Sequence, residues 1–503
     1  MKKNPISIPH TVWYADDIRR GEREAADALG LTLYELMLRA GEAAFQVCRS
    51  AYPDARHWLV LCGHGNNGGD GYVVARLAKA VGIDVTLLAQ ESDKPLPEEA
   101  ALAREAWLNA GGEIHASNIV WPESVDLIVD ALLGTGLQQA PRESISQLID
   151  HANSHPAPIV AVDIPSGLLA ETGATPGAVI NADHTITFIA LKPGLLTGKA
   201  RDVTGQLHFD SLGLDSWLAG QETKIQRFSA EQLSHWLKPR RPTSHKGDHG
   251  RLVIIGGDHG TAGAIRMTGE AALRAGAGLV RVLTRSENIA PLLTARPELM
   301  VHELTMDSLT ESLEWADVVV IGPGLGQQEW GKKALQKVEN FRKPMLWDAD
   351  ALNLLAINPD KRHNRVITPH PGEAARLLGC SVAEIESDRL HCAQRLVQRY
   401  GGVAVLKGAG TVVAAHSDAL GIIDVGNAGM ASGGIIGALL GQKMSPYDAA
   451  CAGCVAHGAA ADVLAARFGT RGMLATDLFS TLQRIVNPEV TDKNHDESSN
   501  SAP

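Results

Sequence analysis

The stretch CGHGNNGGDGYVVARLAKA, residues 62–80, is a glycine-rich turn between two expected elements. It follows the apolar run HWLVLCG (57–63), which is typical of a buried strand, and it enters an amphipathic helical pattern. Its glycines permit close backbone approach, and the N–H groups at a helix start attract anions. Asn66, Asn67 and Asp70 add polarity that a simple dinucleotide fingerprint lacks. The stretch predicts a strand, a phosphate-binding turn and a helix; a tight turn without a ligand is the alternative.

Further apolar runs of strand length follow in the first half of the chain. They are DVTLLA (84–89), VDLIVDALLG (125–134), PIVAVDIPSG (158–167) and HTITFIAL (184–191). The spacing leaves room for crossover helices, and a helix is also expected to begin near Thr11. This pattern predicts a Rossmann-like, doubly wound parallel sheet, in which ligands bind at the carboxyl ends of the strands.

A polar stretch around residues 214–226 separates this half from a second α/β series. The second set of strand-like runs covers 251–257, 278–284, 316–326, 343–350, 365–373 and 403–415. A chain of 503 residues is also too long for one hydrophobic core. We therefore expect two large α/β domains, followed by a polar C-terminal end that should be disordered.

Composition narrows the class of protein. Hydrophobic residues make up 45% of the chain, and the net charge of −11 argues against a nucleic acid or a membrane surface as the main partner. The six cysteines are scattered, which favours a reducing compartment. We find no signal peptide pattern and no apolar run as long as a membrane span. These features predict a cytoplasmic protein.

Three strand ends in the first half carry polar motifs: GNNGGDG (65–71), DALLGTG (130–136) and VDIPSGL (162–168), and LKPGLL (191–196) follows them. Together they resemble the epimerase domain of NAD(P)H-hydrate repair enzymes, over residues 1–215. The resemblance implies a site for the hydrate formed by Asn66, Asn67, Gly68, Gly69, Asp70, Gly134, Thr135, Gly136, Leu137, Gln138, Gln139, Ala140 and Asp163. It also implies a monovalent cation site, usually potassium, at Asn67, Asp130 and Ser166.

The chemistry of such a hydrate calls for an acid. Its hydroxyl lies on the ring carbon next to nitrogen, so the nitrogen lone pair can expel it once a proton is supplied, and water can re-enter from either face. Asp163 is our candidate catalytic acid–base residue, a role worth about 10²–10⁴ in rate. Two interpretations of Lys192 stay open: it steadies negative charge, or it is a solvated lysine at a strand end.

The second half resembles the nucleotide-dependent NAD(P)H-hydrate dehydratase, a ribokinase-like α/β fold, over residues 229–490. Residues 216–228 then form a linker and residues 491–503 a tail. The matching motifs are KGDHGRLVIIGGDHGTAGA, GPGLG, DADAL, TPHPGE, KGAGT and GNAGMASGG. The resemblance implies that Ala264, Gly324 and His370 contact the hydrate. It implies that the nucleotide, ADP or ATP, binds Lys407, Gly408, Ala409, Gly410 and Thr411.

Several of these residues have structural alternatives. His370 lies between Pro369 and Pro371, so a rigid turn competes with a binding role. Asp348 and Asp350 are candidates for magnesium binding or for capping the next helix, and we favour capping.

The loop GNAGMASGG (426–434) departs from the family pattern. In the family it continues through a glycine–aspartate pair whose Asp activates the hydroxyl, whereas this chain passes from Gly434 directly to Ile435. The gap is about two helical turns, a length that nearly preserves the face a helix presents. By sequence the nearest acids are Asp424 and Asp448. We therefore expect the fold to survive and the dehydratase to be impaired or dead.

The leading hypothesis is thus a metabolite-repair enzyme that epimerises NADH and NADPH hydrates. A ribokinase-like small-molecule kinase and a non-catalytic nucleotide-binding protein are the alternatives. A kinase would need a base at the same missing position, so the gap argues against the kinase alternative as much as against an active dehydratase. The resemblance further implies a homo-oligomer.

Overall fold

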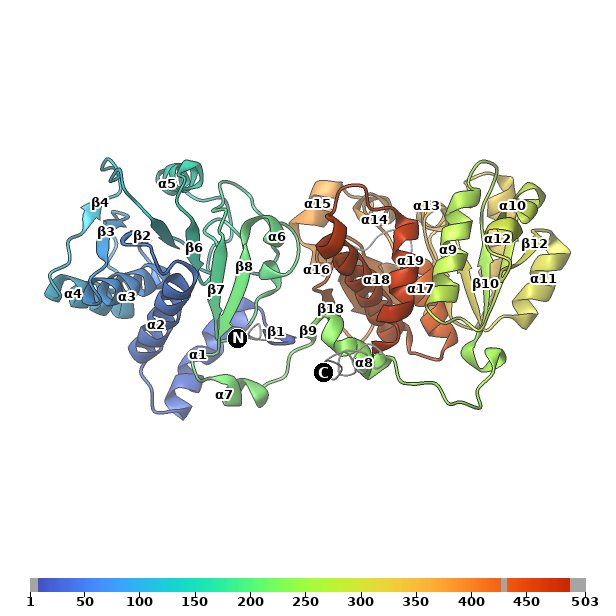
Figure 1. Ribbon diagram of the computed structural model, residues 1–503, viewed down its shortest axis with the longest axis horizontal. Coiled ribbons are helices and arrows are strands. Elements are labelled where there is room, and N and C mark those ends of the chain that lie inside the picture. Colours follow the sequence, from blue (N-terminus) through green and yellow to red (C-terminus); the bar gives the residue numbers. More distant parts are fainter. Residues whose placement is uncertain (1–7, 427–431, 489–503) are drawn as a thin grey trace, which may run out of the picture. The chain divides into compact units, whose positions relative to one another are not determined.

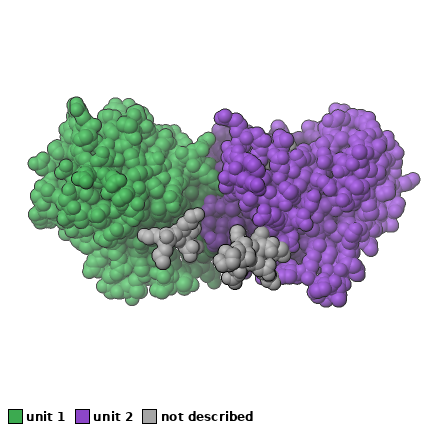
Figure 2. All heavy atoms as spheres, in the orientation of Figure 1, with its two compact units in different colours: residues 1–226 green, residues 227–503 purple. Residues whose placement is uncertain are grey.

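The computed structural model describes residues 8–426 and 432–488, and it divides the chain into two compact units, residues 1–226 and 227–503 (Figure 2). The division falls inside the stretch expected to be a linker. That stretch contains the end of a short helix, α7 (Asp215–Ala219), and a strand, β9 (Ile225–Phe228).

The first unit is built on a parallel sheet with the order β4-β3-β2-β5-β6-β7-β8. The strands are β2 (His57–Cys62), β3 (Asp84–Ala89), β4 (His115–Ala116), β5 (Leu127–Ala131), β6 (Ile159–Val162), β7 (His184–Phe188) and β8 (Gln206–Asp210). The strand order reverses between β2 and β5, which is the switch point at which doubly wound sheets bind ligands. The predicted Rossmann-like fold class is confirmed.

Helices cover both faces of this sheet (Figure 1). They are α1 (Ala15–Ala28), α2 (Leu33–Ala51), α3 (Asn66–Ala80), α4 (Glu98–Asn109), α5 (Glu143–Ser154) and α6 (Ala200–Val203). Alternate residues of β2 point to opposite faces. Trp58 and Val60 join the core beneath α1 to α4, and Leu59 and Leu61 join the core beneath α5.

The helix expected near Thr11 begins later, at Ala15. Thr11–Val12 is extended as β1, Val12 forms a parallel bridge to Leu191, and the Trp13 N–H donates to the Leu191 carbonyl at 2.8 Å. These bonds to a distant segment hold the backbone in an extended conformation, a tertiary effect that the local sequence pattern does not contain.

The second unit contains a larger sheet with the order β9-β18-β17-β16-β15-β14-β13-β10-β11-β12. Its strands beyond β9 are β10 (Arg251–Ile255), β11 (Leu279–Thr284), β12 (Met300–Glu303), β13 (Val318–Ile321), β14 (Met345–Trp347), β15 (Arg365–Ile367), β16 (Val403–Leu406), β17 (Val412–Ala415) and β18 (Leu420–Ile423). The strands from β12 to β16 run parallel, and β16, β17 and β18 alternate in direction. The run 403–415 is therefore two antiparallel strands joined by the turn that carries Lys407.

The helices of this unit are α8 (Leu233–Trp236), α9 (Ala262–Arg274), α10 (Ile289–Ala295), α11 (Met306–Trp315), α12 (Glu329–Val338), α13 (Asp350–Ile357), α14 (Pro371–Leu378), α15 (Val382–Ser387), α16 (Arg389–Tyr400), α17 (Ser432–Gly441), α18 (Pro446–Phe468) and α19 (Leu478–Ile485). One core joins α9, α17, α18 and α19 to the sheet. Helix α18 is long and apolar enough to cross a membrane, contrary to our expectation, but 67% of its most apolar window is buried inside the protein, as in a core helix.

Candidate active site

The first unit contains a cavity of about 980 Å³ at the carboxyl ends of β2, β5 and β6. Nearly all residues that sequence analysis assigned to the hydrate site line this cavity: Asn66, Asn67, Asp70, Gly134, Thr135, Gly136, Leu137, Gln138, Gln139, Ala140 and Asp163. The exceptions are Gly68 and Gly69, which are buried in the first turns of α3. Three motifs far apart in sequence thus form one site.

Two glycines explain why the first motif folds so tightly. A Cβ atom on Gly63 would lie 1.7 Å from the Leu132 carbonyl oxygen, and one on Gly68 would lie 2.1 Å from the Gly63 carbonyl oxygen. Only glycine fits at both positions. The start of α3 therefore packs directly against the end of β2 and the loop after β5, which places Asn66 and Asn67 in the helix's first turn.

Asp163 follows β6 and adopts a left-handed backbone conformation, with φ of 70°. Such a conformation costs a non-glycine residue about 1–3 kcal/mol and is concentrated at functional sites. Its carboxylate accepts hydrogen bonds from the Thr187 hydroxyl at 3.1 Å and from the Lys192 ammonium at 3.3 Å. Lys192 is 3% exposed and also donates to the Phe188 carbonyl, so the interpretation of a solvated lysine is wrong. Burial beside Asp163 requires an ionic partner for each charge.

The three residues expected to hold a cation belong to one buried network. The Ser166 hydroxyl donates to the Asp130 carboxylate at 2.6 Å, and the Asn67 amide donates to the Leu133 carbonyl at 2.9 Å. Burial raises the pKa of Asp130 to about 6, although hydrogen bonds from Ser166 oppose that shift. The Asn67 Oδ1 atom is buried without a hydrogen-bond partner. A fully buried carboxylate and an orphaned amide oxygen suit a cation with oxygen ligands.

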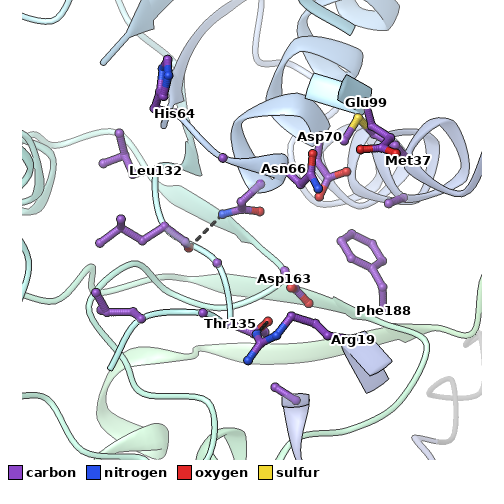
Figure 3. Close-up of a pocket in the computed structure, with 18 of the residues that line it drawn as sticks. Arg19, Met37, His64, Asn66, Asp70, Glu99, Leu132, Thr135, Asp163 and Phe188 are labelled. Carbon is purple, nitrogen blue, oxygen red and sulfur yellow. Dashed lines mark hydrogen bonds between the residues drawn. The ribbon is translucent and has the colours of Figure 1, made fainter. Parts of the chain in front are cut away.

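Sequence analysis missed the cavity wall contributed by the N-terminal helices. Arg19 reaches the cavity from α1 and Met37 from α2 (Figure 3). Glu22 of α1 also lines it. The Arg19 guanidinium donates to the Thr135 hydroxyl at 2.9 Å. These residues carry no motif, and α1 is held at this edge of the sheet by contacts to distant segments, among them the β1 bonds and the Ala15 N–H bond to Glu171, so we see no sequence signal that could have identified them.

Carboxyl groups gather in this cavity. Figure 3 shows Asp70, Glu99 and Asp163 around the same space. Burial, followed by the negative charges of Asp163 and Glu22, raises the pKa of Asp70 well above its usual range. Burial and Asp163 also raise the pKa of Glu22, whereas Lys192 and Arg19 lower it. The site therefore has carboxyl groups with different affinities for a proton.

In the second unit, the predicted residues also follow neighbouring strands. The Ala264 N–H donates to the Thr261 carbonyl, and the Thr261 hydroxyl donates to the Gly324 carbonyl at 2.9 Å. The Lys407 N–H donates to the Pro369 carbonyl, next to His370. Hydrogen bonds thus link Ala264 with Gly324, and the Lys407 turn with His370, at the carboxyl edge of the sheet.

His370 caps a helix, and its ring stays accessible. Its Nδ1 atom accepts from the Gly372 and Glu373 N–H groups at 3.0 and 3.2 Å, which caps the start of α14. The ring is nevertheless about half exposed. Burial and the nearby Lys407 charge lower its pKa, so the imidazole is neutral at pH 7 with Nε2 carrying the proton.

The structure corrects two expectations about acids in this unit. Neither Asp348 nor Asp350 caps α13 through its side chain, because the cap position is Ala349. Asp348 instead accepts from the Thr368 hydroxyl at 2.8 Å and from Lys407 at 3.4 Å. Asp348 also lies next to the start of α17. A Cβ atom added to Gly433 would be 3.3 Å from its Oδ2 atom.

The two acids nearest in sequence are engaged elsewhere. Asp424 pairs with Arg227 at 3.0 Å, and Asp448 lies in the first turn of α18. Residues 427–431 of the loop GNAGMASGG lie outside the described residues. From Ser432 onward, every residue of α17 is buried and its first turn has no acid.

Comparison with known proteins decides the family. The chain is 97% identical over 510 residues to the bifunctional NAD(P)H-hydrate repair enzyme Nnr of Escherichia coli K12, covering 100% of this chain and 99% of that protein. The chain belongs to the family of bifunctional NAD(P)H-hydrate repair enzymes. The Nnr protein of Vibrio cholerae is 43% identical over 96% of this chain and 99% of its own length.

Both parts of a bifunctional repair enzyme are present. Residues 33–194 match the YjeF-related protein N-terminus family, and residues 252–484 match the NAD(P)H-hydrate dehydratase family. The chain is an enzyme with an epimerase domain and a ribokinase-like dehydratase domain. Since the alignment to the E. coli relative spans 510 residues and this chain has 503, at least seven positions of the relative have no counterpart here.

Among solved structures, the ADP/ATP-dependent NAD(P)H-hydrate dehydratase of Bacillus subtilis, co-crystallised with ATP/Mg2+, is 26% identical with a TM-score of 0.46, over 52% of this chain and 97% of that one. A ribokinase-like superfamily protein of Enterococcus faecalis is 29% identical with a TM-score of 0.49, over 53% of this repair enzyme and 97% of its own chain.

Proposed function

We propose that the first unit interconverts the R and S hydrates of NADH and NADPH, with Asp163 as a catalytic acid–base residue. The observation that carries this proposal is the single cavity that gathers the residues of three separate motifs with Asp163. Residues Asn66–Gly69 hold the phosphates at the start of α3, where N–H groups favour anions. Residues 134–140 line the pocket for the nicotinamide end.

The reaction begins when an acid protonates the hydroxyl on the ring carbon next to nitrogen. The C–O bond breaks, water leaves, and the nitrogen lone pair forms a C=N bond, which makes the ring a cation. The Asp163 carboxylate, paired with Lys192, stabilises that cation in a low-dielectric cavity. Water then adds to the carbon from the opposite face and loses a proton to a carboxylate, which gives the other epimer.

We propose a potassium ion held by Asn67, Asp130 and Ser166, together with the Leu133 carbonyl oxygen. The orphaned Asn67 oxygen and the buried Asp130 carboxylate support it. When bound, the ion supplies a fixed positive charge beneath the loop after β5. The chain's own contribution is to keep that loop in place, because the Ser166 hydroxyl accepts from the Leu133 N–H at 2.9 Å.

For the second unit we propose a dehydratase cleft that binds its ligands but turns over poorly or not at all. Ala264, Gly324 and His370 would contact the hydrate. Lys407–Thr411 would contact ADP or ATP. Asp348 or Asp350 would be a ligand of a magnesium ion. The support for impairment is the shortfall of at least seven positions against the E. coli relative, a length that matches the expected gap, and the acid-free first turn of α17. Losing a general base costs about 10²–10⁴ in rate.

Asp348 does not replace the missing base in this proposal. Its carboxylate is 7% exposed and already engages Thr368 and Lys407. A carboxylate at this position also repels the phosphate groups that the start of α17 would otherwise attract.

We further propose a cytoplasmic homo-oligomer with no nucleic-acid or membrane partner. Family membership favours hydrate repair over a small-molecule kinase or a non-catalytic nucleotide-binding protein, and the retained Asp163 favours catalysis in the first unit.

The experiment is incubation of pure S-hydrate with the full chain, without nucleotide, followed by chiral chromatography. Appearance of the R-hydrate above the rate without protein supports the epimerase. Failure to form it, with the hydrate still binding, would support the non-catalytic alternative instead.

A further inference from the structure

We infer that the epimerase unit uses two carboxyl groups, with Asp70 serving one face of the nicotinamide ring and Asp163 the other. The inference rests on the proposed epimerase function and assigns Asp70, so far only a contact residue, a catalytic role.

The two groups reach one cavity from different elements. Asp70 lies in the second turn of the helix after β2, and Asp163 directly follows β6. The strands β2 and β6 are separated by β5 alone, so their axes lie about 10 Å apart. Both residues line the same cavity of about 980 Å³, and Figure 3 shows both side chains around that space. We infer that the planar ring lies between them, with a reacting contact of about 3–3.5 Å on each side.

The two carboxyl groups have different surroundings. The Asp163 carboxylate accepts hydrogen bonds from the Lys192 ammonium and the Thr187 hydroxyl. No hydrogen-bond or ion-pair partner of the Asp70 carboxyl occurs within residues 8–426 and 432–488. The charged groups that act on it are Asp163 and Glu22, both acidic. An unpaired carboxyl among acids favours its protonated form, and a pair of carboxyl groups in opposite states divides acid and base work.

Glu22 and Glu99 line the same cavity but are less suited to this role. They come from α1 and α4, whereas Asp70 belongs to the motif that also provides the phosphate-binding turn. The position of Asp70 relative to the ring is therefore fixed by the same helix that holds the cofactor.

Each of the two carboxyl groups handles one proton. The Asp70 carboxyl gives its proton to the hydroxyl on its face, the C–O bond breaks, and water departs from the cationic ring. Water on the Asp163 face forms the new C–O bond and gives a proton to the Asp163 carboxylate. The net result is inversion at carbon and transfer of one proton from Asp70 to Asp163, which exchange with solvent reverses.

The test uses the full chain and its Asp70→Asn and Asp163→Asn variants, with Asp54→Asn, an exposed turn residue of the same unit, as the matched control. Each pure epimer is incubated in ¹⁸O-labelled water without nucleotide. Chiral chromatography with mass spectrometry then measures both inversion and label entering the unchanged epimer.

We expect inversion to fall by about 10²–10⁴ in each pocket variant and to stay unchanged in the control. Each pocket variant should still exchange oxygen in one epimer, through its remaining carboxyl group, and the two variants should exchange opposite epimers. That retained exchange also shows that each variant is folded.

Unchanged inversion by Asp70→Asn would overturn the inference while leaving the epimerase intact, as would exchange of the same epimer by both variants. A wild-type chain that inverts neither epimer would instead overturn the proposed function, before any variant is compared.

Discussion

The two units place their motifs at the same kind of position, the carboxyl edge of a parallel sheet, but they differ in what the polar groups face. In the first unit, Asp70 and the Asn67 oxygen face the site without partners from the described chain. In the second, Asp348 pairs with Lys407 and Thr368, and His370 caps a helix. The first cavity therefore offers unpaired polar groups that a ligand can pair with, whereas Asp348 and His370 of the second unit are already engaged by the protein.

The same comparison separates folding from chemistry. Seven residues turn a helix through almost two full turns, so the loss that we propose after Gly434 would return nearly the same face to the core. The described part of α17 fits that expectation: Gly437 lies against Val320, and the Ile436 side chain lies against Gly453. A helix can therefore keep its packing while losing the residues that perform catalysis.

The largest expected effect comes from restoring the second site. Inserting after Gly434 a seven-residue segment that carries the Gly-Asp pair of the family pattern should raise dehydration by about 10²–10⁴ or more, because both a base and anion-binding amides return. Recovery of nicotinamide absorbance with ADP or ATP measures it. The matched control carries the same insertion with Asp changed to Asn, and equal recovery by both would contradict a role for the base.

The next effect concerns the first site. Asp163→Asn should slow epimerisation about 10²–10⁴-fold, since the amide neither transfers a proton nor stabilises the ring cation. Initial rates by chiral chromatography, compared with Asp54→Asn, measure the loss. If the rate does not change, the cavity is not the site that we describe.

Part of the fold and of the first site could be predicted from the sequence. The glycine-rich turn, the strand ends and Asp163 could be predicted because each motif is local and the topology brings strand ends together. The gap after Gly434 could be noticed only through the family resemblance, since nothing in residues 432–441 themselves is unusual for a buried helix.

What escaped prediction depends on distant contacts. The wall formed by Arg19 and Glu22 follows from the pairing of residues 12–13 with Leu191. The burial of Lys192 beside Asp163 and the position of Asp348 at the start of α17 likewise need the assembled sheet. Local periodicity carries no information about such pairs.

A smaller expected effect tests the proposed cation site through the stability of the first unit. Burial raises the pKa of Asp130 from its model-peptide value near 4 to about 6, so the folded state binds this proton more tightly than the unfolded chain does. The resulting stability is present below about pH 4 and is lost as the pH rises through 6. The loss is about 3 kcal/mol at about 1.4 kcal/mol per unit of pKa.

Potassium should offset that loss. We expect KCl to raise the unfolding temperature of the first unit more at pH 7.5 than at pH 5, relative to tetramethylammonium chloride, by about 2–4 °C for each kcal/mol. Differential scanning calorimetry measures the shift. Asp130→Asn should abolish the potassium dependence; an identical shift in that variant would place the ion elsewhere.

The smallest effect is expected at Asp348. Because this carboxylate is already engaged by Lys407 and Thr368 and does not act as the base in our proposal, Asp348→Asn should leave any residual dehydration within about twofold. Single-turnover absorbance with excess protein measures it. A large further loss would mean that Asp348 has taken over as proton acceptor.

The contrast between the two units is tested most directly by one assay on the unmodified chain, with the E. coli relative in parallel. A mixture of R- and S-NADH hydrate, first enriched in one epimer, is followed by chiral chromatography and then by absorbance after ADP or ATP is added. We predict that both proteins equilibrate the epimers and that only the relative regenerates NADH. Regeneration by this chain at the rate of the relative would contradict the account.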